Sequence, residues 1–279
     1  MRINENLAKS DLPQANAVVD GYRQRLQSDY GYPIEITRTD SRSGPGATSR
    51  SYWDQRTPLP NHWVEIAPCA PWLEPHKLAH ELTHIALECE AHQAGRRKTH
   101  LLLEPTYRRL LATIDPCLRD DESLLQKLFS LSLNVAVDLV VESRTKRDFP
   151  DLIPAQFINL HKFEERNARE YPAIWQRIIA SPELLQAMDA LVAVRALFAD
   201  SIAPSPLKHF DRFRGTPAGD LAEKMHTDFQ DAFSRGMAPG DHYDLADRWA
   251  VLLGLPGLHD WDPRPAFEIR QPVSHPEIT

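Results

Sequence analysis

The sequence predicts an α+β fold that is mostly helical, with a small β element near the N-terminus. Two short runs rich in β-branched and aromatic residues, 34–39 and 62–67, are typical of strands. In most of the chain after them, apolar residues recur at the three- and four-residue intervals of a helix. At 279 residues, with 42% hydrophobic and 25% charged residues, the chain is long enough to bury a substantial core.

Composition and charge narrow the classes of function. A formal net charge of −7 argues against nucleic acid as the main partner, because binding to phosphates needs a basic face. The three cysteines, Cys69, Cys89 and Cys117, lack CxxC spacing, so we expect reduced thiols and a cytoplasmic location. No signal peptide or run of 18 apolar residues is found, so we expect no membrane partner. A protein or peptide partner is favoured, and the oligomeric state is not indicated.

The N-terminal region, 1–60, is expected to hold one helix, one strand and a loop. Apolar positions at helical spacing predict an amphipathic helix over 14–29, which ends before Gly31. The strand at 34–39 follows, and a segment rich in Ser, Gly, Arg and Pro over 41–51 predicts a loop.

The middle region, 61–150, begins with the strand at 62–67 and is otherwise expected to be helical. Its three predicted helices cover residues 75–90, 100–114 and 120–146. The last region, 151–279, is predicted to be helical, with a helix starting at Ser181, stops at Gly236 and Gly254, and a polar, proline-rich tail over 260–279.

The helix expected over 75–90 contains an HExxH motif with the sequence HELTH at residues 80–84. Two histidines four residues apart lie on one face of a helix, so the imidazoles of His80 and His84 can reach one metal ion. Glu81 lies one residue round the helix, where its carboxylate can meet a water on that metal without binding the metal itself. The motif therefore predicts two metal ligands and a general base.

The HELTH string, in a helix that follows a strand, resembles the HExxH zinc metallopeptidases, the zincins. It is most similar to the thermolysin-like branch, the gluzincins and minigluzincins, over roughly residues 61–147. The resemblance implies a zincin-like unit with a strand beside a cleft, an active-site helix and a second helix that returns with an acidic third ligand. It also implies a Zn²⁺ cofactor, hydrolysis of peptide bonds, and alignment of an extended substrate by the strand at 62–67.

A catalytic zinc takes three protein ligands and keeps one position for water, so a third ligand is needed. Along 120–146, an apolar seam with spacings of three and four continues into two acids, Asp138 and Glu142. A buried carboxylate is costly without a cation or a hydrogen-bonded partner. We therefore assign Asp138 as the third ligand and Glu142 as the partner of one histidine's outer N–H. The reverse assignment stays open, because thermolysin-like enzymes carry the two residue types in the opposite order.

Other interpretations of these acids remain. Glu104 is a rival third ligand by its distance from the motif, although Pro105 disfavours a helical conformation there. Glu142 could instead pair with Lys146 on a solvated helix face. Cys69 is interpreted as a small packed residue rather than a thiolate ligand.

The function favoured by these residues is that of a zinc-dependent metallopeptidase acting on a protein or peptide substrate, with Glu81 as general base. One alternative is a non-enzymatic zinc protein whose helical half binds a partner, and another is a latent regulatory protease whose helical half covers the cleft. A donor to the reacting carbonyl oxygen is not singled out. The candidates are His161, Tyr171, His226, His242 and Tyr243.

Overall fold

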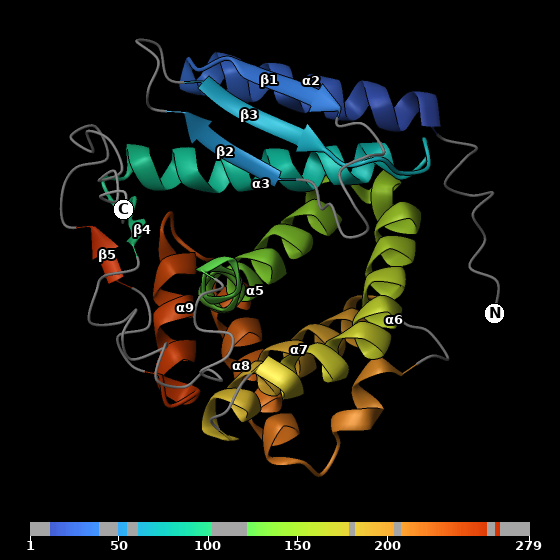
Figure 1. Cartoon of the computed structure of the whole chain (residues 1–279). Coiled ribbons are helices and arrows are strands. Elements are labelled where there is room, and N and C mark those ends of the chain that lie inside the picture. The colour runs from blue at the N-terminus through green and yellow to red at the C-terminus, as the bar shows by residue number, and fades with distance from the viewer. Residues whose placement is uncertain are drawn as a thin grey trace, which may run out of the picture.

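The structure of the chain is a computed structural model that describes residues 12–38, 50–54, 61–101, 122–178, 182–203, 208–255 and 260–262. Helices dominate these residues and a small sheet lies near the N-terminus (Figure 1), which confirms the predicted mostly helical α+β fold. Within the described ranges, no helix has the length and apolar character needed to cross a membrane.

The sheet has the strand order β1-β3-β2, with β1 at Ile34–Arg38, β2 at Arg50–Asp54 and β3 at Asn61–Ile66. β1 runs parallel to β3, and β2 runs antiparallel to it. The two predicted strands are present, but β2 was missed, because it starts within the end of the predicted loop. β3 is the middle strand and pairs on both sides, so the expectation that it aligns a substrate is wrong.

Two helices complete the N-terminal layer. α3 (Glu74–Gln93) lies against β2 and β3, and α2 (Leu12–Tyr30) packs along α3 (Figure 1). Both correspond to predicted helices and are a few residues longer. Their apolar stripes join the sheet in one buried cluster, which includes Val19, Leu26, Ile34, Val64, Ile66, Leu82 and Ile85.

The remaining helices form a second, larger core. They are α5 (Glu122–Asp148), α6 (Ile153–Ile178), α7 (Pro182–Ile202), α8 (Pro217–Ser234) and α9 (Asp241–Leu252). α7 is apolar on most sides and lies inside this body, where burying each large apolar side chain contributes about 1.5–3 kcal/mol. Val140 of α5 is packed in the same cluster as Leu191, Met225 and Leu245. The core of the helical body therefore includes α5, on the N-terminal side of residue 150.

Helix ends follow the predicted signals. α7 begins at Pro182, and Gly236 and Gly254 follow α8 and α9 with φ angles of 81° and 72°, a conformation that favours glycine. Thr216 caps α8 by accepting a hydrogen bond from the Gly219 N–H at 3.0 Å.

Four short elements complete the described part of the chain. They are the 3-10 helices η2 (Pro150–Leu152) and η3 (His209–Phe213) and an antiparallel pair of β4 (Thr99–Leu101) and β5 (Asp260–Asp262). The helix predicted over 100–114 is wrong at its start, because residues 100 and 101 belong to β4. The rest of that helix, and the predicted tail after residue 262, lie outside the described residues.

Candidate metal centre

α3 presents two faces with different chemistry. Leu78, Leu82 and Ile85 pack in the N-terminal core, as their spacing predicts. His80 and His84 lie on the other face, where α3 contacts α5, and their side chains are 19% and 24% exposed. The helix thus buries one side for stability and keeps its histidines within reach of a small solute.

Three side chains from α3 and α5 converge on one point. The Nε2 atoms of His80 and His84 lie 3.1 Å apart, and Oδ1 of Asp138 lies 3.8 Å and 3.3 Å from them. These three ligand atoms all lie within 4.8 Å of one another, so His80, His84 and Asp138 could hold a metal ion. Two residues of the sequence motif and the acid on the α5 seam are therefore brought together.

Glu142, one helical turn after Asp138, reaches the opposite side of His80. Nδ1 of His80 lies 2.9 Å from Oε1 of Glu142, and Glu142 is buried. A proton on Nδ1 that is donated to this carboxylate leaves Nε2 free to bind a metal. Glu142 therefore contacts the outer nitrogen of His80, while Lys146 donates to the Ile202 carbonyl at 2.8 Å.

Two further residues hold Glu142, and both were missed from the sequence. Nε2 of His76 lies 3.2 Å from Oε2 of Glu142, and Gln156 of α6 donates to the same oxygen at 2.6 Å. Gln156 also donates to the Glu142 carbonyl at 2.8 Å. His76 precedes His80 by four residues, so helical spacing could have revealed it, whereas nothing local marks Gln156.

The acids and histidines of the cluster shift one another's pKa values. Burial opposes the charged form of His80, but the hydrogen bond and charge of Glu142 outweigh it and raise the His80 pKa to about 9. Burial likewise opposes ionisation of both acids. His76 and His80 nevertheless hold the pKa of Glu142 well below its usual range, and His84 lowers that of Asp138. The two acids are thus carboxylates that attract cations.

Glu81 is buried beside this cluster, with 4% of its surface exposed. Among the described residues, its carboxylate makes no hydrogen bond or ion pair, and its negative charge contributes to the raised pKa of His80. Within that part of the chain, its oxygens therefore have no hydrogen-bond partner, and their negative charge acts on the cluster.

The other sequence candidates have different surroundings. Glu104 and the side chain of Tyr171 lie outside the described residues. Cys69 is half-buried and packs against the apolar core, as interpreted from the sequence.

The remaining candidates for a carbonyl-oxygen donor are engaged with other groups or buried. Nε2 of His161 lies 3.0 Å from the Ala203 carbonyl oxygen, and Tyr243 donates to Glu88 at 2.7 Å. Burial lowers the pKa of His226, and it lowers that of His242 to about 4, with the charge of His84 acting in the same direction on His242.

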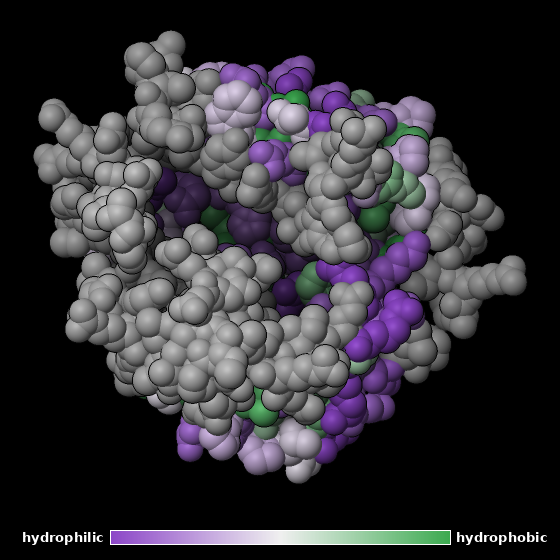
Figure 2. Space-filling model, in the orientation of Figure 1, coloured by the Kyte–Doolittle hydropathy of each residue, from purple (hydrophilic) through white to green (hydrophobic). Residues whose placement is uncertain are grey.

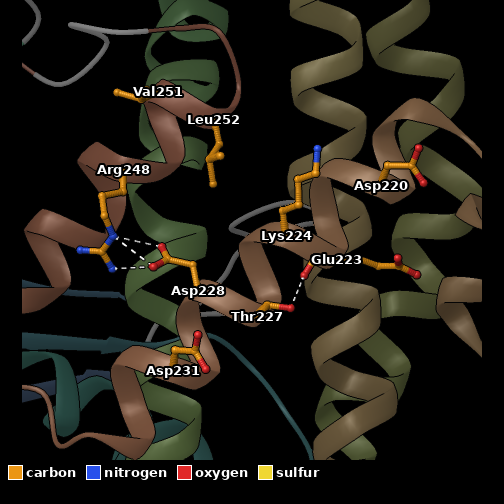
Figure 3. Close-up of a pocket in the computed structure, with 9 residues that line it drawn as sticks. All are labelled: Asp220, Glu223, Lys224, Thr227, Asp228, Asp231, Arg248, Val251 and Leu252. Atoms are coloured by element: carbon orange, nitrogen blue, oxygen red, sulfur yellow. Dashed lines mark hydrogen bonds and ion pairs between the residues drawn. The ribbon is translucent and has the colours of Figure 1, made fainter.

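Concave regions of the described surface differ in their relation to the metal cluster. On the face shown in Figure 2, the molecule is hollowed, and hydrophilic residues are visible deep in the hollow. A separate groove of about 910 Å³ lies between α8 and α9 (Figure 3). Its wall includes the ion pair of Arg248 with Asp228, and it shares no residue with the metal cluster. This groove therefore plays no part in the metal centre.

Comparison with protein-family models, curated proteins and solved structures finds no match to this chain.

Proposed function

We propose that this protein is a zinc-dependent metallopeptidase in which His80, His84 and Asp138 bind Zn²⁺. The observation that carries the proposal is the convergence of the two Nε2 atoms and the carboxylate oxygen within 4.8 Å. Two imidazoles and one carboxylate form a common ligand set of catalytic zinc. Glu142 supports it, because its contact with Nδ1 of His80 favours the tautomer that a metal ligand needs.

The same arrangement favours a catalytic over a structural site. Structural zinc sites are closed by four protein ligands, whereas catalytic sites use three and keep one position for water. The group found among the described residues has three members, each partly exposed. A non-enzymatic zinc protein would need a further ligand.

Each residue then has a defined task. A zinc ion held by His80, His84 and Asp138 would lower the pKa of a bound water towards about 7 and would polarise a substrate carbonyl. Glu81 would accept a proton from that water and return it to the leaving amine. Glu142, held by His76 and Gln156, fixes the orientation of His80. The carboxylates of Asp138 and Glu142 would balance the charge of the cation.

An extended peptide substrate can be aligned by the sheet. β2 is an edge strand of the described sheet and, with β3, it lies against α3, which carries the motif. Its unpaired edge offers backbone N–H and C=O groups for a further strand. β2, rather than the predicted β3, is therefore the proposed substrate strand.

The deciding experiment removes only the base. Glu81→Gln keeps the size of the side chain but cannot accept the proton, so turnover should fall by about 10²- to 10⁴-fold while zinc content stays near one per chain. The assay incubates zinc-loaded wild type and variant with a proteome-derived peptide library and identifies new termini by mass spectrometry. Glu223→Gln, an exposed acid on α8, is the matched control and should cleave like wild type. Equal cleavage by wild type and Glu81→Gln would contradict the proposal.

A further inference from the structure

Arg195 of α7 lies where three helices meet beside the metal cluster. One of its terminal nitrogens is 4.0 Å from Oδ2 of Asp138 on α5, and its Nε is 3.9 Å from Oε1 of Glu164 on α6. Its guanidinium carbon lies 4.0 Å from the centre of the Phe163 ring. The cation is thus positioned by an aromatic ring and shared between two carboxylates.

Glu164 favours a positive charge at the position of the Arg195 guanidinium. Its side chain is 3% exposed, and Oε2 is buried with no hydrogen-bond partner in the described part of the chain. Burial raises the pKa of Glu164 to about 7, against the opposing charge of Arg195. A buried acid with an unpaired oxygen destabilises the fold unless a cation lies next to it. Glu164 therefore favours a guanidinium held at this position, as does stacking on Phe163.

The two oxygens of Asp138 face different partners. Oδ1 points to the histidines, at 3.3 Å from Nε2 of His84, while Oδ2 is attracted to Arg195 at 4.0 Å. A carboxylate can bind a metal through one oxygen or through both. An attraction that is strongest at Oδ2 favours binding through Oδ1 alone.

We propose that Arg195 is a positioning residue that holds Oδ2 of Asp138 away from the metal, so that Asp138 binds through one oxygen and a coordination position stays open for water. Phe163 and Glu164 fix the guanidinium in place. Arginine suits this role better than lysine, because its planar fork can stack on a ring and face two carboxylates at once. The inference rests on the proposed function, since it concerns the same metal site.

Cobalt(II) reports the coordination number directly, because four-coordinate Co²⁺ absorbs visible light more strongly than five-coordinate Co²⁺. The full chain is loaded with one equivalent of Co²⁺, and the spectra are compared at equal metal content. Arg195→Gln should lose d–d absorption intensity, because Asp138 is released to bind through both oxygens. Glu164→Gln and Arg195→Lys should lose intensity in the same direction to a smaller extent.

Arg248→Gln is the matched control, because it removes an arginine that pairs with Asp228 away from the cluster, and it should leave the spectrum unchanged. Spectra identical to that of wild type in all three test variants would overturn the inference. If Arg195→Gln does not fold, the spectra of Arg195→Lys and Glu164→Gln test the inference in its place. Failure of wild type to bind Co²⁺ would overturn both proposals. Cobalt binding with the expected spectral losses but no peptide cleavage would overturn the peptidase alone.

Discussion

Among the described residues, two groups combine two histidines with one aspartate, and they differ in whether they could hold a metal ion. In the first, His80, His84 and Asp138 direct ligand atoms to a common point. In the second, Nδ1 of His161 lies 2.7 Å from Nε2 of His209, and Asp200 lies close by in sequence and space.

The difference lies in which hydrogen bonds are already made. Asp200 accepts from the backbone N–H groups of His209 at 3.1 Å and Phe210 at 3.0 Å, at the start of η3. Nε2 of His161 is occupied by the Ala203 carbonyl. In the first group, Glu142 engages the Nδ1 side of His80 and leaves Nε2 towards the cluster. Residue types alone therefore do not define a metal site. It also matters which of their nitrogen and oxygen atoms already take part in other hydrogen bonds.

The largest effect expected from this comparison is on zinc content. His84→Ala and Asp138→Ala should reduce zinc from one per chain to near zero, because each removes a ligand, whereas His209→Ala should keep it. Elemental analysis of chelator-free protein, with circular dichroism as a folding check, measures this. Full zinc content in Asp138→Ala together with its loss in Glu104→Ala would identify Glu104 as the ligand instead.

Glu164 is expected to give the next largest effect, on stability against pH. Its pKa is raised from 4.5 to about 7 by burial, so the folded state binds the proton more tightly than the unfolded state does. The free energy of unfolding should therefore fall as pH rises from about 4.5 to 7, by about 3 kcal/mol from this group. Glu164→Gln stays neutral and should remove that loss in urea unfolding at pH 5 and pH 8. The exposed neighbour substitution Glu165→Gln should retain it, and an unchanged pH dependence in Glu164→Gln would refute the assignment.

Glu142→Gln compares the two acids that lie beside histidine pairs. The amide keeps the shape but loses the charge that draws the Nδ1 proton of His80, so zinc affinity should fall by about 10- to 100-fold. Asp200→Asn should leave zinc affinity unchanged, because Asp200 serves the backbone of η3. Competition with a chromogenic chelator measures both, and equal losses in the two variants would contradict the distinction.

Much of this architecture follows from local sequence. The HExxH spacing predicts which α3 residues face a metal, and the apolar seam of α5 predicts that Asp138 and Glu142 face inward. β2 was missed because a loop-like composition precedes its aromatic pair, Tyr52 and Trp53, which is itself a strand signal.

Other features depend on contacts between distant segments. The middle position of β3 depends on pairing with β2, which no periodicity encodes. Arg195 and Gln156 reach the centre from α7 and α6, so their roles follow only from how the helices pack. The sequence thus predicts the residues that could hold a metal ion better than the residues that pack around them.

The smallest effect is expected on the free energy of unfolding when the second histidine group is changed. This experiment tests whether that group has only a structural role. Asp200→Ala removes the acceptor for two backbone N–H groups at the start of η3, which should lower the free energy of unfolding by about 1–2 kcal/mol. Asp200→Asn keeps one acceptor oxygen and should lose less, and zinc content should be unchanged in both. Urea unfolding and elemental analysis give the two readouts. Loss of zinc in Asp200→Ala, with the fold intact, would mean that the packing of α7 couples the two groups, because Asp200 and Arg195 lie on the same helix.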